Sequence, residues 1–185
     1  VSDMKVNGSI TYAATADEPV ELIKNNDCDT TNKYGTYIAG GAEAELSSKD
    51  GQLALEIADV GKLNYGVQLY YDILPLYKNG VYRLSFDVSS DTDRFIEAMI
   101  QMNGGDYQSY VWAGVDVSSE VTHISKEFTM EYESDVFAKL CFNCGNQEKD
   151  GGIGAHTLYF DNIHLELIDD SAVDYTEFEV VEEKI

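Results

Sequence analysis

The chain has 185 residues and a mass of 20.5 kDa, which is enough for one domain with a full hydrophobic core. Its 34 Asp and Glu residues outnumber its 12 Lys and Arg residues, so the formal net charge at pH 7 is −22. This charge argues against binding to nucleic acid or to an anionic membrane surface, because both need clustered Lys and Arg. The content of 44% hydrophobic and 11% aromatic residues argues against disorder.

The three cysteines, Cys28, Cys141 and Cys144, are odd in number and do not form a known metal or redox motif. Cys141 and Cys144 lie in a strand-like run, where alternation places them on opposite faces. We therefore expect structural cysteines. No apolar stretch approaches the 18 residues of a membrane helix. The chain starts without a leader-like apolar region, as expected if a signal peptide was removed or the segment was excised from a longer protein.

Hydrophobic residues alternate with a period of two along most of the chain, which is the pattern of β-strands. In chain order, the expected strands cover residues 20–24, 52–58, 66–73, 81–89, 94–102, 109–113, 123–130, 136–144 and 156–168. Turn residues separate most of them, for example Asn79-Gly80 and Asn103-Gly104-Gly105. Short strands joined by such turns predict an all-β sandwich or barrel.

We expect the folded domain to span residues 20–168. Residues 1–19 form an N-terminal extension or an edge strand, and the sequence leaves both possibilities open. Residues 169–185 are acidic and contain no Gly or Pro, so we interpret them as a C-terminal linker or a loosely attached extra strand.

Alternation also gives several strands an apolar face toward the core and a second face that mixes amides, charges and aromatic rings. The outward residues predicted in this way include Gln68, Tyr70, Asp72, Glu97, Gln101, Lys139 and Asn143. Amides and charged groups can hydrogen-bond sugar hydroxyls, and aromatic rings can cover apolar C–H faces. The alternative is an ordinary solvated surface.

Catalytic motifs are absent from the sequence. The three histidines, His123, His156 and His164, do not form a metal-binding pattern, and no nucleophile elbow or convincing carboxylate pair is present. We therefore expect a binding protein rather than an enzyme.

Seven segments in order resemble carbohydrate-binding modules of families 4 and 9. They are LIKNNDCD (22–29), DGQLALEI (50–57), NYGVQLYYDI (64–73), LYKNGVYRLSFDVSSDTDR (76–94), EFTMEY (127–132), FAKLCFNCG (137–145) and HTLYFDNIHLEL (156–167). The resemblance implies a jelly roll of two antiparallel sheets that binds β-glucan or xylan in a cleft across the concave sheet. The family opening N-G-D-F-E, followed by Trp, reads N-N-D-C-D here, with Tyr34 and Tyr37 nearby.

Carried over by position, the resemblance places the aromatic contacts on Tyr37 and Tyr107. It places the polar contacts on Gln68, Asp72, Glu97, Gln101, Lys139 and Asn143. Several relatives carry Arg at the position of Glu97 and Gln at that of Lys139. Tyr110 and Trp112 lie in the same loop-strand region, and Trp112 is either a sugar platform or a core residue.

The resemblance also implies a structural calcium ion, distant from the cleft. Its ligands would be Asp27 or Asp29, the carbonyl of Gly51 and Asp161. Such oxygen-only ligation suits a hard cation. In the alternative, Asp161 and Asn162 form a polar bulge without an ion.

Taken together, the resemblance implies a non-catalytic module of a secreted, bacterial polysaccharide-degrading enzyme, which holds an attached glycoside hydrolase on β-glucan chains. A xylan- or mannan-binding module is the alternative on the same fold. A calcium-stabilised adhesion domain is an alternative of a different class, and a jelly-roll hydrolase is a third.

Overall fold

The computed structural model describes residues 4–6, 9–11, 13–147 and 152–178. Strands make up nearly all of its regular structure, and the helical element of the described chain is the short 3-10 helix η2 (Tyr175–Phe178). No helix within these ranges is long and apolar enough to cross a membrane.

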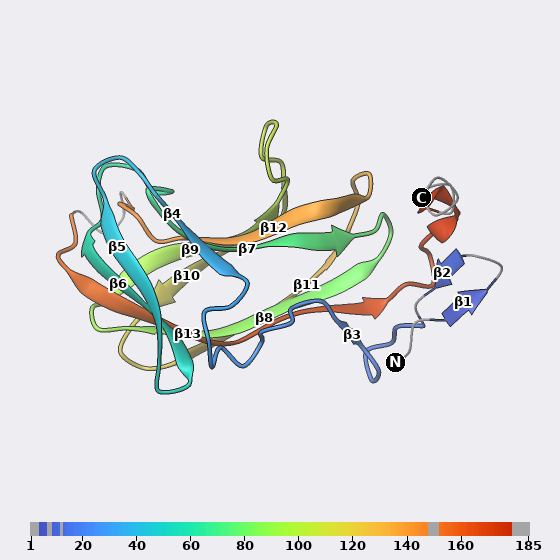
Figure 1. Cartoon of the computed structure of the whole chain (residues 1–185), viewed down its shortest axis with the longest axis horizontal. Helices are drawn as coiled ribbons and strands as arrows, with labels where there is room; N and C mark the ends of the chain where they lie inside the picture. The colour runs from blue at the N-terminus through green and yellow to red at the C-terminus, as the bar shows by residue number, and fades with distance from the viewer. Residues whose placement is uncertain (1–3, 7–8, 12, 148–151, 179–185) are drawn as a thin grey trace.

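Two antiparallel sheets pack against each other as a β-sandwich jelly roll, which confirms the predicted fold class (Figure 1). The five-stranded sheet has the order β10 (Ser109–Val117), β9 (Arg94–Gln101), β12 (Asp135–Asn143), β7 (Val67–Leu76) and β4 (Tyr34–Ile38). The second sheet has the order β11 (Thr122–Thr129), β8 (Val81–Ser90), β13 (His156–Asp169), β6 (Gln52–Asp59) and β5 (Glu43–Lys49), and β3 (Val20–Glu21) also pairs with β13.

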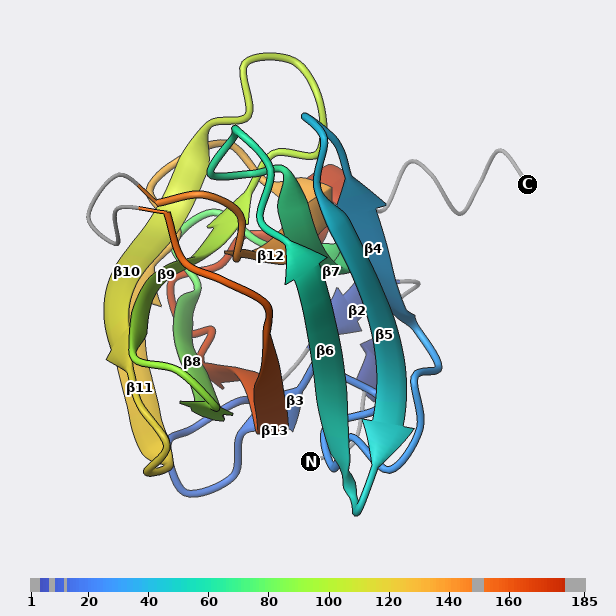
Figure 2. The ribbon, with the colours of Figure 1, turned by 90° about the vertical axis from the view of Figure 1, so that its left-hand side faces the viewer.

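The core lies between the two sheets, which Figure 2 shows from the end of the sandwich. Strand β8 shows how the sequence produces it, because Tyr82, Leu84, Phe86 and Val88 alternate with polar residues and are all buried. On the opposite sheet, the ring of Phe142 lies 5.0 Å from that of Phe86, measured between centroids. Burial of such side chains contributes roughly 1.5–3 kcal/mol each, so period-two alternation dictates which face of each strand turns inward.

Strand β7 departs from simple alternation at Ile73. We expect Ile73 to share the inward face of Val67, Leu69 and Tyr71, but its side chain is 67% exposed. Its φ is +57°, and the pairing of β7 with β12 shifts between Tyr71 and Leu74. This is a β-bulge, in which one extra residue reverses the inward face of the strand. The prediction for Ile73 is therefore wrong, and Leu74 takes its place in the core.

Two strands of the sandwich, β4 and β5, have no counterpart among the expected strands. Both lie at sheet edges, where β5 alternates exposed with half-buried residues and β4 has no fully buried residue. An edge strand buries little apolar surface, so its sequence carries a weak hydrophobic pattern.

The described terminal segments pack beyond one end of the sandwich, where β1 (Met4–Val6) pairs with β2 (Ser9–Thr11) and η2 lies beside β2 (Figure 1). The Ala14 N–H donates to Asp170 Oδ1 at 3.2 Å, and the Tyr175 hydroxyl donates to Asp170 Oδ2 at 2.9 Å. Residues 1–3, 7–8, 12 and 179–185 of the expected terminal extensions lie outside the described residues. The domain boundaries at residues 20 and 168 stay a prediction.

Candidate functional site

The outer face of the five-stranded sheet collects most of the predicted binding residues. Strand register aligns Tyr37, Gln68, Asn143 and Glu97 in one row across β4, β7, β12 and β9. Four residues away from this row along both β12 and β9, Lys139 lies opposite Gln101. Residues that the sequence separates by up to about a hundred positions therefore share one surface because antiparallel pairing brings them together.

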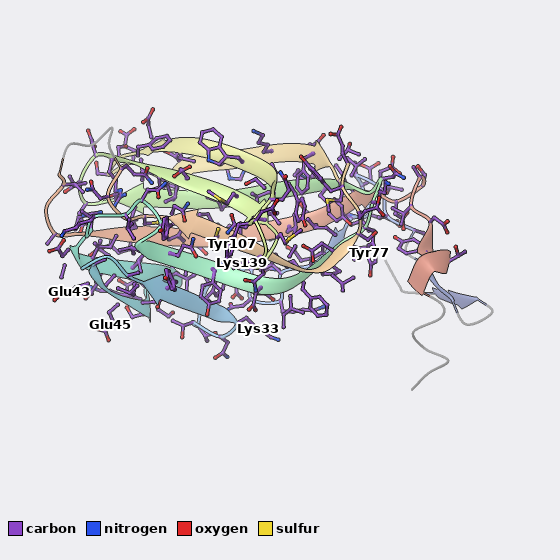
Figure 3. All side chains as sticks on the ribbon, turned by 90° about the horizontal axis from the view of Figure 1, so that it is seen from above. Lys33, Glu43, Glu45, Tyr77, Tyr107 and Lys139 are labelled. Carbon is purple, nitrogen blue, oxygen red and sulfur yellow. The ribbon has the colours of Figure 1, made fainter. Side chains whose placement is uncertain are left out.

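A cleft of about 440 Å³ opens on this surface. It is lined by Tyr37, Asn64, Tyr65, Gln68, Gln101, Tyr107, Lys139 and Asn143. Six of these eight were predicted from the sequence, and the structure brings them together. Seen from above, Tyr107 and Lys139 lie next to each other over the middle of the sheet (Figure 3).

Polar side chains form the floor of the cleft. Gln68, Gln101 and Asn143 are each 7% exposed, so they present little more than their amide tips. Gln68 Nε2 donates to Asn143 Oδ1 at 2.9 Å, and Lys139 Nζ donates to Gln68 Oε1 at 3.4 Å. This chain of hydrogen bonds holds Gln68, Asn143 and Lys139 in place and orients their remaining donors and acceptors.

Three tyrosines form the aromatic part of the cleft. Tyr37, Tyr65 and Tyr107 are 50%, 45% and 54% exposed, respectively, and they line the same cleft, so together they form an exposed aromatic patch. Tyr107 belongs to the loop between β9 and β10, which rises above the sheet (Figure 1). Its φ is +55°, and its N–H donates to Gly104 O at 2.9 Å, so a tight turn directs the ring toward the cleft.

The Lys139 ammonium group lies between two aromatic rings. Its Nζ is 5.5 Å from the centroid of Tyr70 and 5.8 Å from that of Tyr107, both within cation–π range. Tyr70 lies just outside the lining, with its ring above Gly35 of β4. A Cβ on Gly35 would come within 2.5 Å of the Tyr70 ring, so glycine is required for this ring position.

Glu97 and Trp112 lie beside the cleft and do not line it. Their side chains are joined by a hydrogen bond. Glu97 Oε2 accepts from Trp112 Nε1 at 2.8 Å, and Glu97 Oε1 accepts from Asn64 Nδ2 at 3.0 Å. Gln147 Nε2 also donates to Glu97 Oε1, at 3.4 Å. Trp112 is 46% exposed on β10, so it is not a core residue, and both oxygens of Glu97 are engaged in holding its neighbours.

Sequence reasoning missed Asn64 and Tyr65, which precede β7. Their loop lies against Gly145, whose N–H donates to Asn64 O at 2.9 Å. A Cβ on Gly145 would lie 2.1 Å from Leu63 O, so only glycine permits this approach. The signal available in the sequence was a tyrosine directly before Gly66 at the start of an expected strand, but alternation describes strands and not the loops between them.

Asp72 and Tyr110 lie away from the cleft. Asp72 lines a separate hollow of about 520 Å³ beside the sheet edge, together with Lys24 and Lys33. The Tyr110 hydroxyl donates to Asp135 Oδ2 at 2.8 Å, and its ring lies 5.5 Å from that of Tyr132. Both residues lie within bulges, Asp72 in β7 and Tyr110 in β10, and a bulge changes the direction of the side chains it contains.

The cysteines are all buried and free. Cys144 belongs to the core, whereas Cys141 lies in the outward row of β12 beside Tyr70 and Met99. Burial raises the pKa of Cys28 to about 11 and the pKa of Cys141 and Cys144 to about 12. These thiols are therefore protonated at neutral pH and poor nucleophiles.

The residues predicted as calcium ligands come together near one end of the second sheet. A Cβ built on Gly51 would lie 3.4 Å from Asp29 Oδ1, and Ser48 Oγ donates to Asp29 O at 2.7 Å. Burial raises the pKa of Asp161, and the negative charges of Asp87, Asp29 and Asp27 raise it further, against a lowering by the hydrogen bond from the Asn162 N–H.

These donors are all oxygens, which suits calcium. Among the residues that the structure describes, no three His, Cys, Asp or Glu side chains converge on one point. Backbone oxygens such as the Gly51 carbonyl would therefore have to complete a coordination sphere there.

Comparison with known proteins identifies relatives of this fold. A family model described as carbohydrate binding domain matches residues 20–149. A solved structure described as "CBM4 structure and function" has 25% identity and a TM-score of 0.65, covering 83% of this chain and 97% of that one. No curated protein matches the sequence.

Two further solved structures share the fold. The N-terminal cellulose-binding domain of β-1,4-glucanase C from Cellulomonas fimi has 20% identity and a TM-score of 0.60, covering 83% of this chain and 96% of that one. The CBM22-1 xylan-binding domain of Xyn10C from Paenibacillus barcinonensis has 13% identity and a TM-score of 0.53, covering 85% and 99%.

Proposed function

Because the chain belongs to the family of carbohydrate binding domains whose model matches residues 20–149, we propose that its cleft binds single chains of β-linked polysaccharide. The domains of this family bind without catalysing a reaction, so the chain is a non-catalytic carbohydrate-binding module. The bound chain would cross the outer face of the five-stranded sheet.

The observation that carries the proposal is the composition of the cleft. Tyr37, Tyr65 and Tyr107 offer apolar ring surface, and between them lie the amides of Gln68, Gln101 and Asn143. A sugar ring has apolar C–H faces and an edge of hydroxyl groups, so it needs both kinds of partner. A volume of about 440 Å³ lies within the range of small-molecule sites.

We propose β-glucan chains of the cello-oligosaccharide type as the ligand. The cellulose-binding domain from Cellulomonas fimi supports this choice, since it shares the fold over most of its length. The xylan-binding relative supports a xylan ligand as the second candidate, and a mannan would need no change of architecture.

The setting of such a module is also part of the proposal, and one relative supports it. The Cellulomonas fimi domain is described as part of a β-1,4-glucanase, which supports attachment of this module to a catalytic glycoside hydrolase. Long β-linked polysaccharides lie outside cells, so the parent enzyme would be secreted. We also propose a bacterial source. The module then keeps the attached enzyme close to its substrate.

We further propose a structural calcium ion held by Asp27 or Asp29, by the Gly51 carbonyl and by Asp161. The ion would neutralise carboxylates that otherwise repel one another and would join the segment before β4 to β13. The proposed ion plays no part in sugar contact, because none of these residues lines the cleft.

Affinity electrophoresis tests the proposed function. The purified chain is run through native gels that contain β-glucan, xylan, mannan or no polysaccharide. Retardation by at least one β-linked polysaccharide, strongest for β-glucan, is the expected result. Unchanged migration in every gel would contradict polysaccharide binding and favour the adhesion alternative, and retardation by xylan or mannan alone would replace the proposed ligand.

A further inference from the structure

The cleft is lined by a positive charge, whereas the whole protein is strongly negative. Lys139 is the only charged side chain among the eight residues that line it, although the whole chain carries a formal net charge of −22. A binding surface for a neutral sugar chain needs no cation, since amides and hydroxyls suffice for hydrogen bonds to hydroxyl groups. The placement of one of the few lysines at the centre of the cleft therefore indicates a further ligand group.

The ammonium group of Lys139 is held in place but is not neutralised. Its hydrogen bond to the amide oxygen of Gln68 is long at 3.4 Å, and it also lies over the rings of Tyr70 and Tyr107. Within the described part of the chain, no carboxylate lies within 4 Å of Nζ. Because an ammonium group has three donors, Lys139 retains hydrogen-bonding capacity for a ligand.

The carboxylates nearest along the sheet do not compete for this lysine. Both oxygens of Glu97 accept hydrogen bonds from neighbouring side chains, as described above. Asp72, which lies near Lys139 across β7 and β12, lines the separate hollow at the sheet edge. The cleft thus offers a ligand one positive charge, which is flanked by the rings of Tyr70 and Tyr107.

We propose that the cleft prefers a β-linked chain carrying a carboxylated sugar, a hexuronic acid unit, whose carboxylate pairs with Lys139. The inference rests on the proposed function and specifies its ligand. A charge-assisted hydrogen bond between ammonium and carboxylate is stronger than a bond to a neutral hydroxyl. The negative charge of the surrounding protein disfavours a polyanion, so the preferred chain carries isolated acidic units in an otherwise neutral backbone.

Matched ligands test this preference by titration calorimetry in 0.15 M salt. One pair is a xylo-oligosaccharide with a single glucuronic acid unit and the same molecule after reduction of its carboxyl group to an alcohol. The other pair is a cello-oligosaccharide with one glucose oxidised at C6 to the acid, and the unmodified oligosaccharide. Each pair differs in one carboxylate, so the ratio of the two affinities reports the contribution of the charge.

Of the xylan-type and glucan-type pairs, we consider the one whose backbone binds more tightly. Its acidic member should bind about tenfold more tightly than its neutral member, in line with a partly exposed charge-assisted hydrogen bond. Lys139→Gln should reduce this ratio to about one, and Lys139→Arg should preserve most of it. Lys49→Gln is the matched control, because it removes the same charge from an exposed position on β5 of the other sheet, and its ratio should stay near ten.

Two outcomes would overturn the preference for a carboxylate, and a third would overturn the proposed function. Equal binding of both members by the unmodified protein overturns the preference and leaves the proposed function intact. A similar loss of the ratio in Lys49→Gln would show that overall charge, not Lys139, is responsible. Failure of every oligosaccharide to bind would overturn the proposed function itself.

Discussion

Replacing Tyr107 with alanine should weaken polysaccharide binding strongly and leave the fold intact. The ring is 54% exposed on a loop, so its loss removes little core packing. The backbone already has a φ of +55°, and alanine adds no new strain to that turn. Covering roughly 60 Å² of ring and sugar surface contributes about 1.5 kcal/mol at ~25 cal/mol per Å². This corresponds to an affinity about tenfold lower.

The consequence for an assay depends on the starting affinity. Few aromatic contacts and exposed hydrogen bonds predict a dissociation constant on the order of micromolar to a tenth of millimolar. A tenfold loss should visibly reduce retardation in an affinity gel and remain measurable by calorimetry. A nanomolar constant for the unmodified protein would contradict this estimate.

Tyr132→Ala is the matched control, because Tyr132 is 46% exposed and does not line the cleft. Thermal unfolding checks that both variants fold, with an expected cost below about 1 kcal/mol for the exposed Tyr107. The reasoning is refuted if Tyr107→Ala melts like the unmodified protein and is still retarded equally in every gel. Equal losses in both variants would show that the effect does not belong to the cleft.

Three further changes test separate parts of the account. Gln101→Ala should weaken oligosaccharide binding in calorimetry by about two- to tenfold, the equivalent of one hydrogen bond of roughly 0.5–1.5 kcal/mol; an unchanged constant would remove Gln101 from the site. Gly35→Ala should displace the Tyr70 ring, because its Cβ would lie 2.5 Å from that ring, and should lower affinity several-fold. A normal affinity would show that the ring position is unimportant. Calcium at a hundred times its dissociation constant should stabilise the fold by about 2.7 kcal/mol and raise the melting temperature by roughly 5–10 °C over that in EDTA, with a smaller rise in Asp161→Asn. An unchanged midpoint would contradict the calcium site.

The sequence was sufficient to predict the sandwich because apolar alternation is strongest where a strand is covered by the opposite sheet. Strand β8 is such a case, with four alternating residues buried. The same reasoning fails at Ile73, where a bulge reverses the alternation without a clear signal in residue type. It also fails at the edge strands β4 and β5, which bury too little surface to show a pattern.

For the site, alternation predicted the sheet residues of the cleft, and family resemblance added Tyr37 and Tyr107. Gln68, Gln101, Lys139 and Asn143 were predicted because their strands are regular at these points. Asn64 and Tyr65 were missed because their position depends on a contact with Gly145, about eighty residues away. Such a loop contact follows from tertiary packing and leaves no periodic trace in the sequence.

The measurement that tests the central claim most directly is a titration of the isotopically labelled chain with cello-oligosaccharide, followed by amide chemical shifts. The account predicts that shifts concentrate on the cleft, including the side-chain amides of Asn64, Gln68, Gln101 and Asn143. They should saturate with a constant in the range given above. Saturable shifts confined to the second sheet, or to the hollow lined by Lys24, Lys33 and Asp72, would place the binding site elsewhere and contradict the account.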